Sequence, residues 1–511
     1  GGLGGVVESA DLFVIENGAT LRTTETVTQG SPMKMEGEDG GCVENLKDFI
    51  IETPVEGTLL TKKGDGWMKL NTACPSLERL ALDGGTVQCV ACDKPARTVE
   101  FRSGTLYENT GSSYAIHVSE GGSGTWSLAN RSTYTNKITG EGTLTIYCAV
   151  EHGNGWFATR TPVAVNLAQF TGTINATADM ADTYPRFTLN TSSGMPDGTL
   201  NIAGGVTVQN TGRTFRIGKL AGKGALGGYA SFANDGATGV NTWQVGCDDD
   251  FTWVGTVTAN SKLEKVGSGK MTVSGVWDNT GEVAVKEGTL CLNDRSAENA
   301  MLGSGELSVE DGAVLCGLGK LGNASVTVER GGRLYSGTRE GASSGALDFS
   351  GKRLTVSAGG EVMFNVASKI RCTTLEGISS FSLRGTLKVS VREGLELEAG
   401  DEFQLWTANR TVLSSACMLD LDSPGEGLEW DTSALEDGVL KVKTATGIMG
   451  VVSGEPVDCV VYTLDGARAG YFTCMPSEVR EYMEENGFRP GMYMVKMTQG
   501  QRTVSRKVTV D

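Results

Sequence analysis

The densest group of carboxylates in the sequence is the run Asp248, Asp249 and Asp250. In enzymes that cleave polysaccharides, clustered carboxylic acids donate and accept the protons of the reaction. The same run separates two strand-like segments that end at Val245-Gly246 and begin at Phe251, and aspartates favour such turns because they hydrogen-bond to nearby backbone amides. We prefer the turn interpretation and keep the three aspartates as the catalytic candidates.

Cysteine and histidine could bind a metal, and the chain has twelve cysteines and two histidines. Cys89 and Cys92 form a C-x-x-C motif, but a zinc site needs further ligands, and His117 and His152 are distant in sequence. We therefore predict no metal and no cofactor, and we interpret this motif as an inert strand and turn. Cys148 continues an alternating apolar pattern and is expected to point into a core.

The eight tryptophans could stack on sugar rings if several of them were exposed in a row. Trp243, Trp253 and Trp277 occupy strand positions of a repeated pattern, which favours packing inside the fold. The same alternatives, packing or sugar binding, apply to Trp126 and Trp156. No G-x-S-x-G motif with a nearby histidine indicates a nucleophilic hydrolase.

The composition of the chain limits the kinds of molecule that it can bind. The formal net charge is −17 and no basic stripe is present, which argues against nucleic acid as a ligand. No run approaches eighteen apolar residues, so no membrane-spanning helix is expected. The sequence begins at Gly1 without a recognisable signal peptide, and this start is uninformative about export.

The elements that must position these residues are short strands. With 72 glycines and frequent Ser, Thr and Asn, the chain repeats a turn with a central Gly, followed by alternating apolar residues. Clear copies of the pattern are Glu16–Leu21, Glu141–Ile146, Asp197–Ile202, Glu287–Leu292, Arg384–Val389 and Asp437–Val442.

One such strand cannot bury its apolar side alone, whereas stacked coils make a continuous core. We therefore predict an all-β chain in which residues 1–445 form a right-handed parallel β-helix of about twenty coils, a rod roughly 95 Å long at about 4.8 Å per coil. The alternative is a string of antiparallel β-sandwich domains, which also have short strands.

Residues 238–293 resemble the autotransporter-associated β-strand repeat of bacterial passenger domains. The similarity rests on Thr242–Gly246, Leu263–Val273, Trp277–Val285 and Glu287–Leu290, with a weaker copy at Leu60–Leu70. Residues 305–442 are similar to the stretch that follows such repeats. The resemblance implies a parallel β-helix and an extracellular location. Passenger domains continue into a long translocator barrel, but only residues 444–511 follow Lys443, so we expect no self-translocation.

Residues 446–511 resemble the C-terminal sorting domain of proteins that the type IX system of Bacteroidetes exports. The resemblance rests on Val460–Gly466, Arg489–Lys496 and Arg506–Val510. We predict a small β-sandwich-like domain with a hairpin at Asp465-Gly466, a turn near Gly500 and a helix from about Ser477 to Asn486, where the family usually has a shorter loop. Ser477 is expected to cap this helix and Gly487 to end it. This domain is interpreted as an export signal, with a structural cap of the rod as the alternative.

Three functions remain open. The preferred one is a secreted, cell-surface or outer-membrane-associated scaffold or adhesin-like protein, with host or bacterial surface glycans or proteins as partners and the secretion machinery binding the C-terminal domain. The second is a non-catalytic glycan-binding module. The third is a polysaccharide lyase or glycoside hydrolase of the β-helix type, which Asp248, Asp249 and Asp250 would have to serve.

Overall fold

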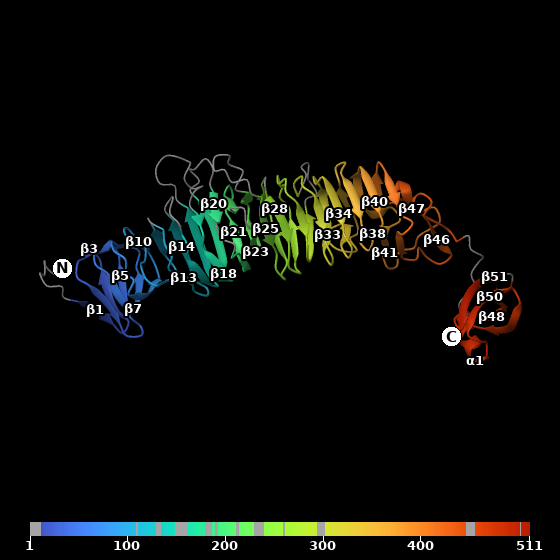
Figure 1. Cartoon of the computed structure of the whole chain (residues 1–511), viewed down its shortest axis with the longest axis horizontal. Coiled ribbons are helices and arrows are strands. Elements are labelled where there is room, and N and C mark those ends of the chain that lie inside the picture. Colours follow the sequence, from blue (N-terminus) through green and yellow to red (C-terminus); the bar gives the residue numbers. More distant parts are fainter. Residues whose placement is uncertain are drawn as a thin grey trace.

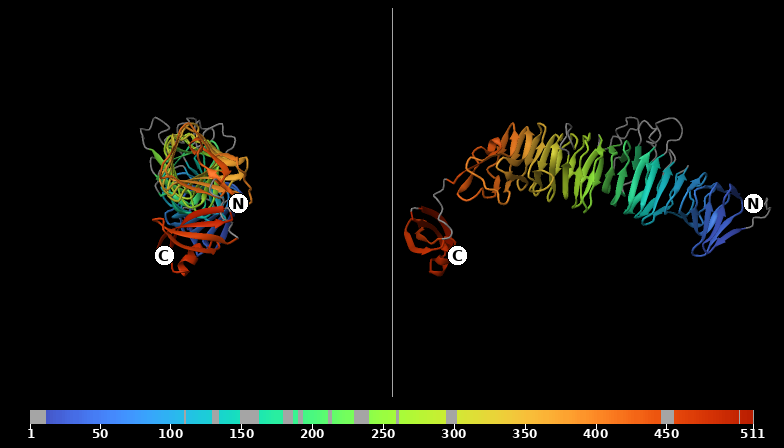
Figure 2. Two further views of the ribbon diagram at one scale, coloured as in Figure 1. Left: turned by 90° about the vertical axis from the view of Figure 1, so that its right-hand side faces the viewer. Right: turned by 180° about the vertical axis from the view of Figure 1, so that it is seen from behind.

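The computed structural model shows an all-β chain in which the strands stack in sequence order along a rod (Figure 1). The structure describes residues 12–108, 111–128, 134–148, 162–178, 186–189, 193–210, 214–228, 240–258, 261–293, 302–445, 455–500 and 502–510. Viewed from the end, the coils wind around a common interior (Figure 2). The prediction of a parallel β-helix is thus confirmed, and the alternative of separate sandwich domains is wrong for the rod.

The longest face, here called the first face, is a stack of eighteen parallel strands with one strand from each coil. In order along the rod these strands are β3 (Val27–Gln29), β6 (Phe49–Ile51), β8 (Trp67–Leu70), β10 (Thr86–Cys89), β12 (Thr105–Glu108), β14 (Ser123–Leu128), β16 (Thr143–Cys148), β19 (Thr173–Ala178), β21 (Met195–Ile202), β23 (Thr214–Gly222), β25 (Asn241–Val245), β28 (Ser261–Lys265), β30 (Val283–Val285), β32 (Leu307–Val309), β34 (Ser325–Val328), β37 (Arg353–Val356), β40 (Ser380–Leu383) and β44 (Thr411–Leu413).

The other faces change along the rod. The N-terminal part has a sheet of β1 (Phe13–Glu16), β2 (Ala19–Thr23), β4 (Met33–Glu36), β5 (Gly41–Asn45), β7 (Val55–Lys63), β9 (Leu77–Leu82), β11 (Thr98–Phe101), β13 (Ala115–Val118), β15 (Lys137–Gly140) and β18 (Asn166–Phe170). The middle part has β17 (Pro162–Val163), β20 (Arg186–Leu189), β22 (Thr207–Asn210), β24 (Ala225–Gly228) and β27 (Thr256–Val257). The C-terminal part has β26 (Phe251–Trp253), β29 (Lys270–Val273), β31 (Thr289–Asn293), β33 (Val314–Lys320), β35 (Arg333–Ser336), β36 (Gly345–Asp348), β38 (Glu361–Ser368), β39 (Arg371–Ile378), β41 (Thr386–Val391), β43 (Trp406–Ala408) and β45 (Met418–Leu421).

The register between the strands of successive coils determines which side chains stack in the interior. Alternate residues of each strand point inward, so equivalent residues of successive coils form apolar columns along the axis. One column of the first face consists of the buried residues Val87, Leu106, Trp126, Ile146, Ala176 and Ile202. The backbone of Cys148 lies in β16 as expected, but its side chain is outside the described part of the structure.

The repeated motif L-x-K-x-G-x-G places a lysine inside the rod twice, as Lys62 and Lys265. Both side chains are fully buried, and each ammonium donates hydrogen bonds to three backbone carbonyl oxygens of the turns beside it. Burial lowers the pKa of both lysines to about 8, although nearby acidic groups oppose the shift. The lysine of the motif therefore stabilises a turn from the inside.

The rod closes its own C-terminal end. The strands β42 (Glu402–Gln404), β46 (Leu428–Asp431) and β47 (Val439–Thr444) form an antiparallel sheet, and the short 3₁₀ helix η3 (Leu435–Asp437) precedes β47. Leu435, Leu440 and Val442 are buried in the same cluster as the rod interior. This segment therefore covers the apolar end of the last coil.

The C-terminal region has its own buried cluster, separate from that of the rod. It is one antiparallel sheet in the order β49 (Arg468–Cys474), β48 (Val457–Thr463), β50 (Gly491–Gln499) and β51 (Arg502–Val510). The short helix α1 (Val479–Glu485) contacts β51 and buries Val479 and Met483, so a helix rather than a second sheet covers one face.

The hairpin at Asp465-Gly466 and the turn at Gly500 are confirmed. The expected cap of the helix is wrong at its start, because Glu478 is the N-cap and makes no side-chain capping bond, whereas Ser477 lies one residue earlier. Its end is as predicted: Gly487 has a positive φ of 76°, and the Phe488 amide donates to the Met483 carbonyl oxygen. In the described ranges no helix has the length and apolar character needed to cross a membrane.

Candidate functional site

Asp248, Asp249 and Asp250 lie in the turn between β25 and β26, and each carboxylate has a partner from another coil. Asp248 Oδ1 accepts from the hydroxyl and the amide of Ser268, at 2.8 and 3.4 Å. Asp249 Oδ2 accepts from Lys219 Nζ at 2.6 Å, and Asp250 Oδ1 accepts from the Lys270 amide at 2.8 Å.

These contacts connect neighbouring coils rather than converging on one point in space. The hydrogen bonds from the Ser268 side chain and backbone lower the pKa of Asp248, whereas a catalytic acid requires a raised pKa. The Asp249 side chain is largely exposed on the turn. In this arrangement the three aspartates hold the turn and offer no acid–base pair.

The tryptophans of the repeat are packed inside the rod. Trp126, Trp243, Trp253 and Trp277 are all buried, and the rings of Trp253 and Trp277 lie 5.9 Å apart between centroids. The packing prediction is confirmed for Trp243, Trp253 and Trp277, and of the two alternatives left open for Trp126 the structure shows packing. Trp156 is outside the described residues.

One tryptophan that the sequence interpretation passed over is exposed. Trp67 on β8 is 41% exposed, and its ring centroid lies 6.4 Å from that of Tyr107 on β12, with an interplanar angle of 51°. The alternation of β8 could have revealed it, because inward Met68 and Leu70 leave Trp67 on the outer side.

Hydroxyl groups continue from this aromatic pair along the rod. The register places Thr86, Thr105, Thr125 and Thr145 in one outward column that begins at Trp67. We call Trp67, Tyr107 and these four threonines the outer strip.

Two asparagines extend this column in the next coils. The Asn175 side-chain amide donates to the Thr145 hydroxyl at 3.3 Å, and that of Asn201 donates to Asn175 Oδ1 at 2.8 Å. The result is a row of hydrogen-bonding side chains with two mutually tilted aromatic rings at one end.

A buried polar cluster lies beneath the outer strip, centred on Glu108 of β12. Its carboxylate accepts from Tyr114 Oη at 2.5 Å, Trp126 Nε1 at 2.8 Å and Ser112 Oγ at 2.9 Å. The side chain is only 1% exposed, and burial raises the pKa of Glu108 to about 7 against the opposing effect of these hydrogen bonds. The cluster fixes β12 against β14, and Tyr107 precedes Glu108 on β12.

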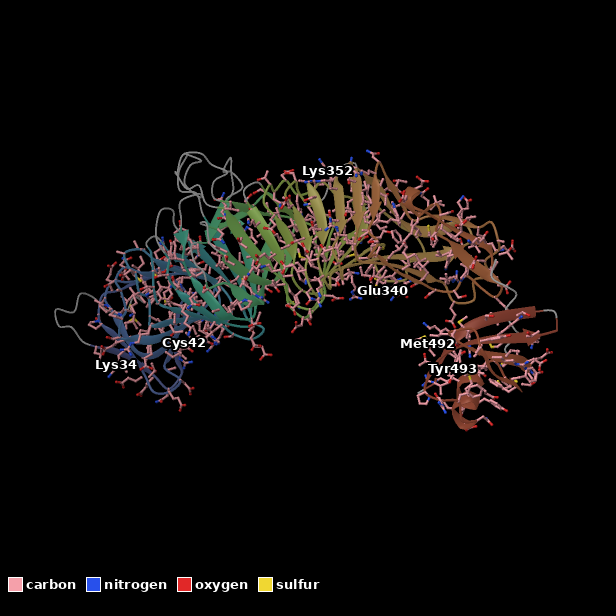
Figure 3. All side chains as sticks on the ribbon, turned by 45° about the vertical axis from the view of Figure 1, so that its right-hand side comes forward. Lys34, Cys42, Glu340, Lys352, Met492 and Tyr493 are labelled. Atoms are coloured by element: carbon pink, nitrogen blue, oxygen red, sulfur yellow. The ribbon has the colours of Figure 1, made fainter. Side chains whose placement is uncertain are left out.

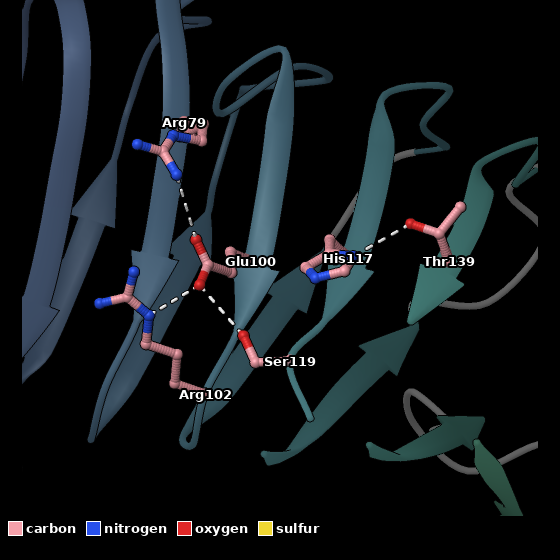
Figure 4. Close-up of polar contacts among 6 residues, drawn as sticks. All are labelled: Arg79, Glu100, Arg102, His117, Ser119 and Thr139. Atoms are coloured by element: carbon pink, nitrogen blue, oxygen red, sulfur yellow. Dashed lines mark hydrogen bonds and ion pairs between the residues drawn. The ribbon is translucent and has the colours of Figure 1, made fainter. Parts of the chain in front are cut away.

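A second polar cluster lies on the outer face of the N-terminal sheet (Figure 4). Glu100 accepts from Arg102 Nε at 2.7 Å and from Ser119 Oγ at 3.0 Å, and Arg79 lies 3.8 Å away. Partial burial alone would raise the pKa of Glu100. The hydrogen bonds from Arg102 and Ser119 and the charges of the two arginines outweigh that effect, so the net pKa is lowered.

His117, the histidine within the described residues, lies one coil further along this face. His117 pairs in register with Glu100 and contacts Thr139 Oγ1 through Nδ1 at 3.2 Å, but it is exposed on a flat sheet. His152 is outside the described residues. Because the His117 ring contacts Thr139 and not Glu100, we assign the two residues no catalytic role.

A cavity of about 230 Å³ lies between β35, β38, β39 and the loop that follows β35. Its lining includes Tyr335, Ser336, Glu340, Asn365 and Thr373, and Figure 3 shows Glu340 at the edge of the rod. Much of its polar lining is already engaged, since Ser336 donates to the Gly345 carbonyl oxygen and Thr373 Oγ1 accepts from the Asn365 amide.

Across the residues that the structure describes, no group of three or more His, Cys, Asp or Glu is arranged to hold a metal ion. The outer strip is therefore the best candidate for a functional surface, because it joins the exposed Trp67 to a half-buried row of side chains that is rich in hydroxyl groups. In comparisons with known proteins, no family model matches the chain and no curated protein is significantly similar to it.

Proposed function

We propose that the protein is a cell-surface rod of adhesin-like type that binds glycan chains without cleaving them. The observation that carries the proposal is the outer strip, in which the exposed Trp67, with the half-buried Tyr107 beside it, begins a column of threonine side chains. Aromatic rings cover the apolar face of a sugar ring, while hydroxyl side chains exchange hydrogen bonds with its substituents.

The shape of the strip favours an extended polymer over a small ligand. Successive coils repeat at about 4.8 Å, so a chain lying along the rod meets equivalent groups at regular intervals. Many weak contacts along one polymer add up through effective concentration. The net charge of −17 disfavours polyanions, so neutral polysaccharides on host or bacterial surfaces are the expected partners.

The resemblances in the sequence support the rest of this proposal. An autotransporter-like rod belongs outside the cell, and a C-terminal domain similar to type IX sorting domains would bind the secretion machinery. The rod carries its own antiparallel end segment, which removes the need for residues 446–511 to serve as a cap and favours export as their role.

Binding is tested with the full chain on a glycan array, followed by affinity electrophoresis in gels that contain soluble neutral or acidic polysaccharides. We expect retardation by at least one neutral polysaccharide, and Trp67→Ala to weaken it about tenfold, equivalent to about 1.4 kcal/mol. Trp67→Phe should keep part of the affinity. Tyr471→Ala is the matched control, since Tyr471 is an exposed aromatic of the C-terminal sheet.

Equal retardation of wild type and Trp67→Ala would contradict the assignment of the strip, and binding of acidic polysaccharides alone would contradict the choice of ligand. Export is tested separately by deleting residues 446–511 in the source organism. The truncated chain should accumulate inside the cell, and its normal appearance at the surface would refute the sorting role.

A further inference from the structure

Six of the eleven cysteines whose side chains the structure describes lie in three close pairs. The pairs are Cys89 with Cys92, Cys291 with Cys316, and Cys459 with Cys474. Each pair is on adjacent backbone segments, and all six residues are buried. The three pairs lie in different parts of the chain, so each pair is brought together by its own local strands and turns.

The first pair is inside the rod. Cys89 ends β10 and Cys92 lies in the following turn, with the two Sγ atoms 3.1 Å apart. The neighbouring Cys74 is engaged elsewhere, because its Sγ accepts from the Val55 amide at 3.3 Å and donates to the Thr72 carbonyl oxygen. Cys89 and Cys92 are therefore the natural partners.

The second pair bridges two coils. Cys291 of β31 and Cys316 of β33 are register partners in neighbouring parallel strands. Such strands are about 4.8 Å apart, which is within the Cα separation of about 4.4 to 6.8 Å that a disulfide requires.

A small cluster outside the main core covers this second pair. Val314 and Tyr335 pack against the two cysteines, and Lys270 Nζ donates to the Thr338 carbonyl oxygen at 2.6 Å above them. A hydrogen bond from the Cys316 thiol and the charge of Lys270 lower the pKa of Cys291, although burial opposes the shift. The more readily formed thiolate, which is the nucleophile of thiol–disulfide exchange, is thus on Cys291.

The third pair is in the C-terminal sheet. Cys459 of β48 pairs with Phe472 of β49, and Val457 pairs with Cys474, so the two cysteines are diagonal neighbours on the buried face of a hairpin. Burial, and then the neighbouring Cys474, raise the pKa of Cys459 to about 12. In the structure the Cys459 thiol donates to the Val457 carbonyl oxygen at 3.9 Å and the Cys474 thiol donates to the Met475 carbonyl oxygen at 3.2 Å, so both side chains must turn toward each other when the disulfide forms.

We propose that Cys89–Cys92, Cys291–Cys316 and Cys459–Cys474 become disulfides when the chain meets a disulfide oxidant such as oxidised glutathione. The thiolate of one cysteine attacks a sulfur of the oxidant, forms a mixed disulfide and releases one glutathione thiolate. The second cysteine, on losing its proton, displaces the other glutathione. Two protein thiols are oxidised and one disulfide molecule is reduced to two thiols.

The remaining cysteines stay reduced in this proposal. Cys42, Cys247, Cys372 and Cys417 have free thiols, and those of Cys247, Cys372 and Cys417 hydrogen-bond to backbone carbonyl oxygens. The three disulfides are independent of glycan binding. They would add covalent links within a turn, between two coils and across a hairpin.

The test is to equilibrate the reduced full chain in a glutathione buffer of oxidising poise, once from the folded state and once during refolding from urea. The protein is then alkylated under denaturing conditions, and disulfide-linked peptides are mapped by mass spectrometry. We expect the three named pairs, a mass lower by ~2 Da for each disulfide before alkylation, and six alkylated cysteines.

Cys316→Ser should abolish only the Cys291 link, and Cys474→Ser only the Cys459 link. Cys372→Ser is the control and should leave all three links in place, with circular dichroism showing that each variant folds. Alkylation of all twelve cysteines after both treatments, or links between cysteines of different pairs, would overturn the proposal.

Discussion

Replacing Glu108 by Gln should remove a pH dependence of stability that the wild-type rod carries. Glu108 is buried with three hydrogen-bond donors around it, and its pKa of about 7 in the folded chain compares with 4.5 for an exposed glutamate. Below about pH 4.5 the folded and unfolded chains both hold the proton, so the group then has no effect on folding.

Between about pH 4.5 and 7 the folded chain binds the proton more tightly than the unfolded chain, so stability falls as the pH rises. Above about pH 7 Glu108 is charged in both states, and the folded chain carries the full free-energy cost of burying that charge. The difference between 4.5 and about 7 corresponds to about 3 kcal/mol, at about 1.4 kcal/mol for each pKa unit. Glutamine keeps the shape and one acceptor oxygen but no charge, so this pH-dependent part disappears from the variant.

Hydrogen exchange of the amides of β12 and β14 is the appropriate assay, because a stack of coils opens locally rather than all at once. After correction for the intrinsic rate at each pH, wild-type protection should decrease from pH 5 to pH 8, whereas Glu108→Gln should change little. Protection of β34 and β37 is the internal control. The same pH dependence in wild type and variant would refute the reasoning.

Three further predictions concern the rod. Lys265→Met leaves three carbonyl oxygens without their buried donor, which should cost about 2–4 kcal/mol of local stability by hydrogen exchange. The variant should also lose the wild-type gain in stability between about pH 8 and 10.5, where only the unfolded lysine holds its proton. Gly246→Ala places a Cβ 1.7 Å from the Val266 carbonyl oxygen at φ +141° and should prevent soluble expression, whereas Gly312→Ala, with φ +73° and open space, should cost about 1 kcal/mol in urea unfolding. Asp249→Asn and Asp250→Asn should leave polysaccharide binding unchanged, and reducing-sugar release should be undetectable in both variants and in wild type; release that either substitution abolishes would restore the enzyme hypothesis.

The rod could be predicted because each copy of the repeat is a short stretch of sequence that specifies its own turn and strand. Gly-centred turns and alternating apolar residues determine which residues of each strand face inward, and Trp243, Trp253 and Trp277 are buried accordingly. The hairpin at Asp465-Gly466 is similarly local. The helix cap was misjudged by one residue, since Glu478 rather than Ser477 precedes the helix.

The candidate site could not be predicted because it depends on register between coils. Trp67 and Tyr107 are forty positions apart and meet only because β8, β10 and β12 pair in one particular alignment. Glu108 has an inward position in its strand, where a carboxylate is unexpected, and its partner Trp126 comes from the next coil. Coil lengths vary along the chain, and the sequence alone does not reveal which residues of consecutive coils become neighbours.

The antiparallel segment at the end of the rod has a consequence for assembly. A stack of parallel coils presents at its last strand an unpaired ladder that can template the next strand, as at the growing tip of a cross-β filament. In this chain β42, β46 and β47 form a separate antiparallel sheet at that end, and Leu435, Leu440 and Val442 join the apolar interior there. We therefore expect this segment to hinder the addition of another parallel coil at this end of the rod.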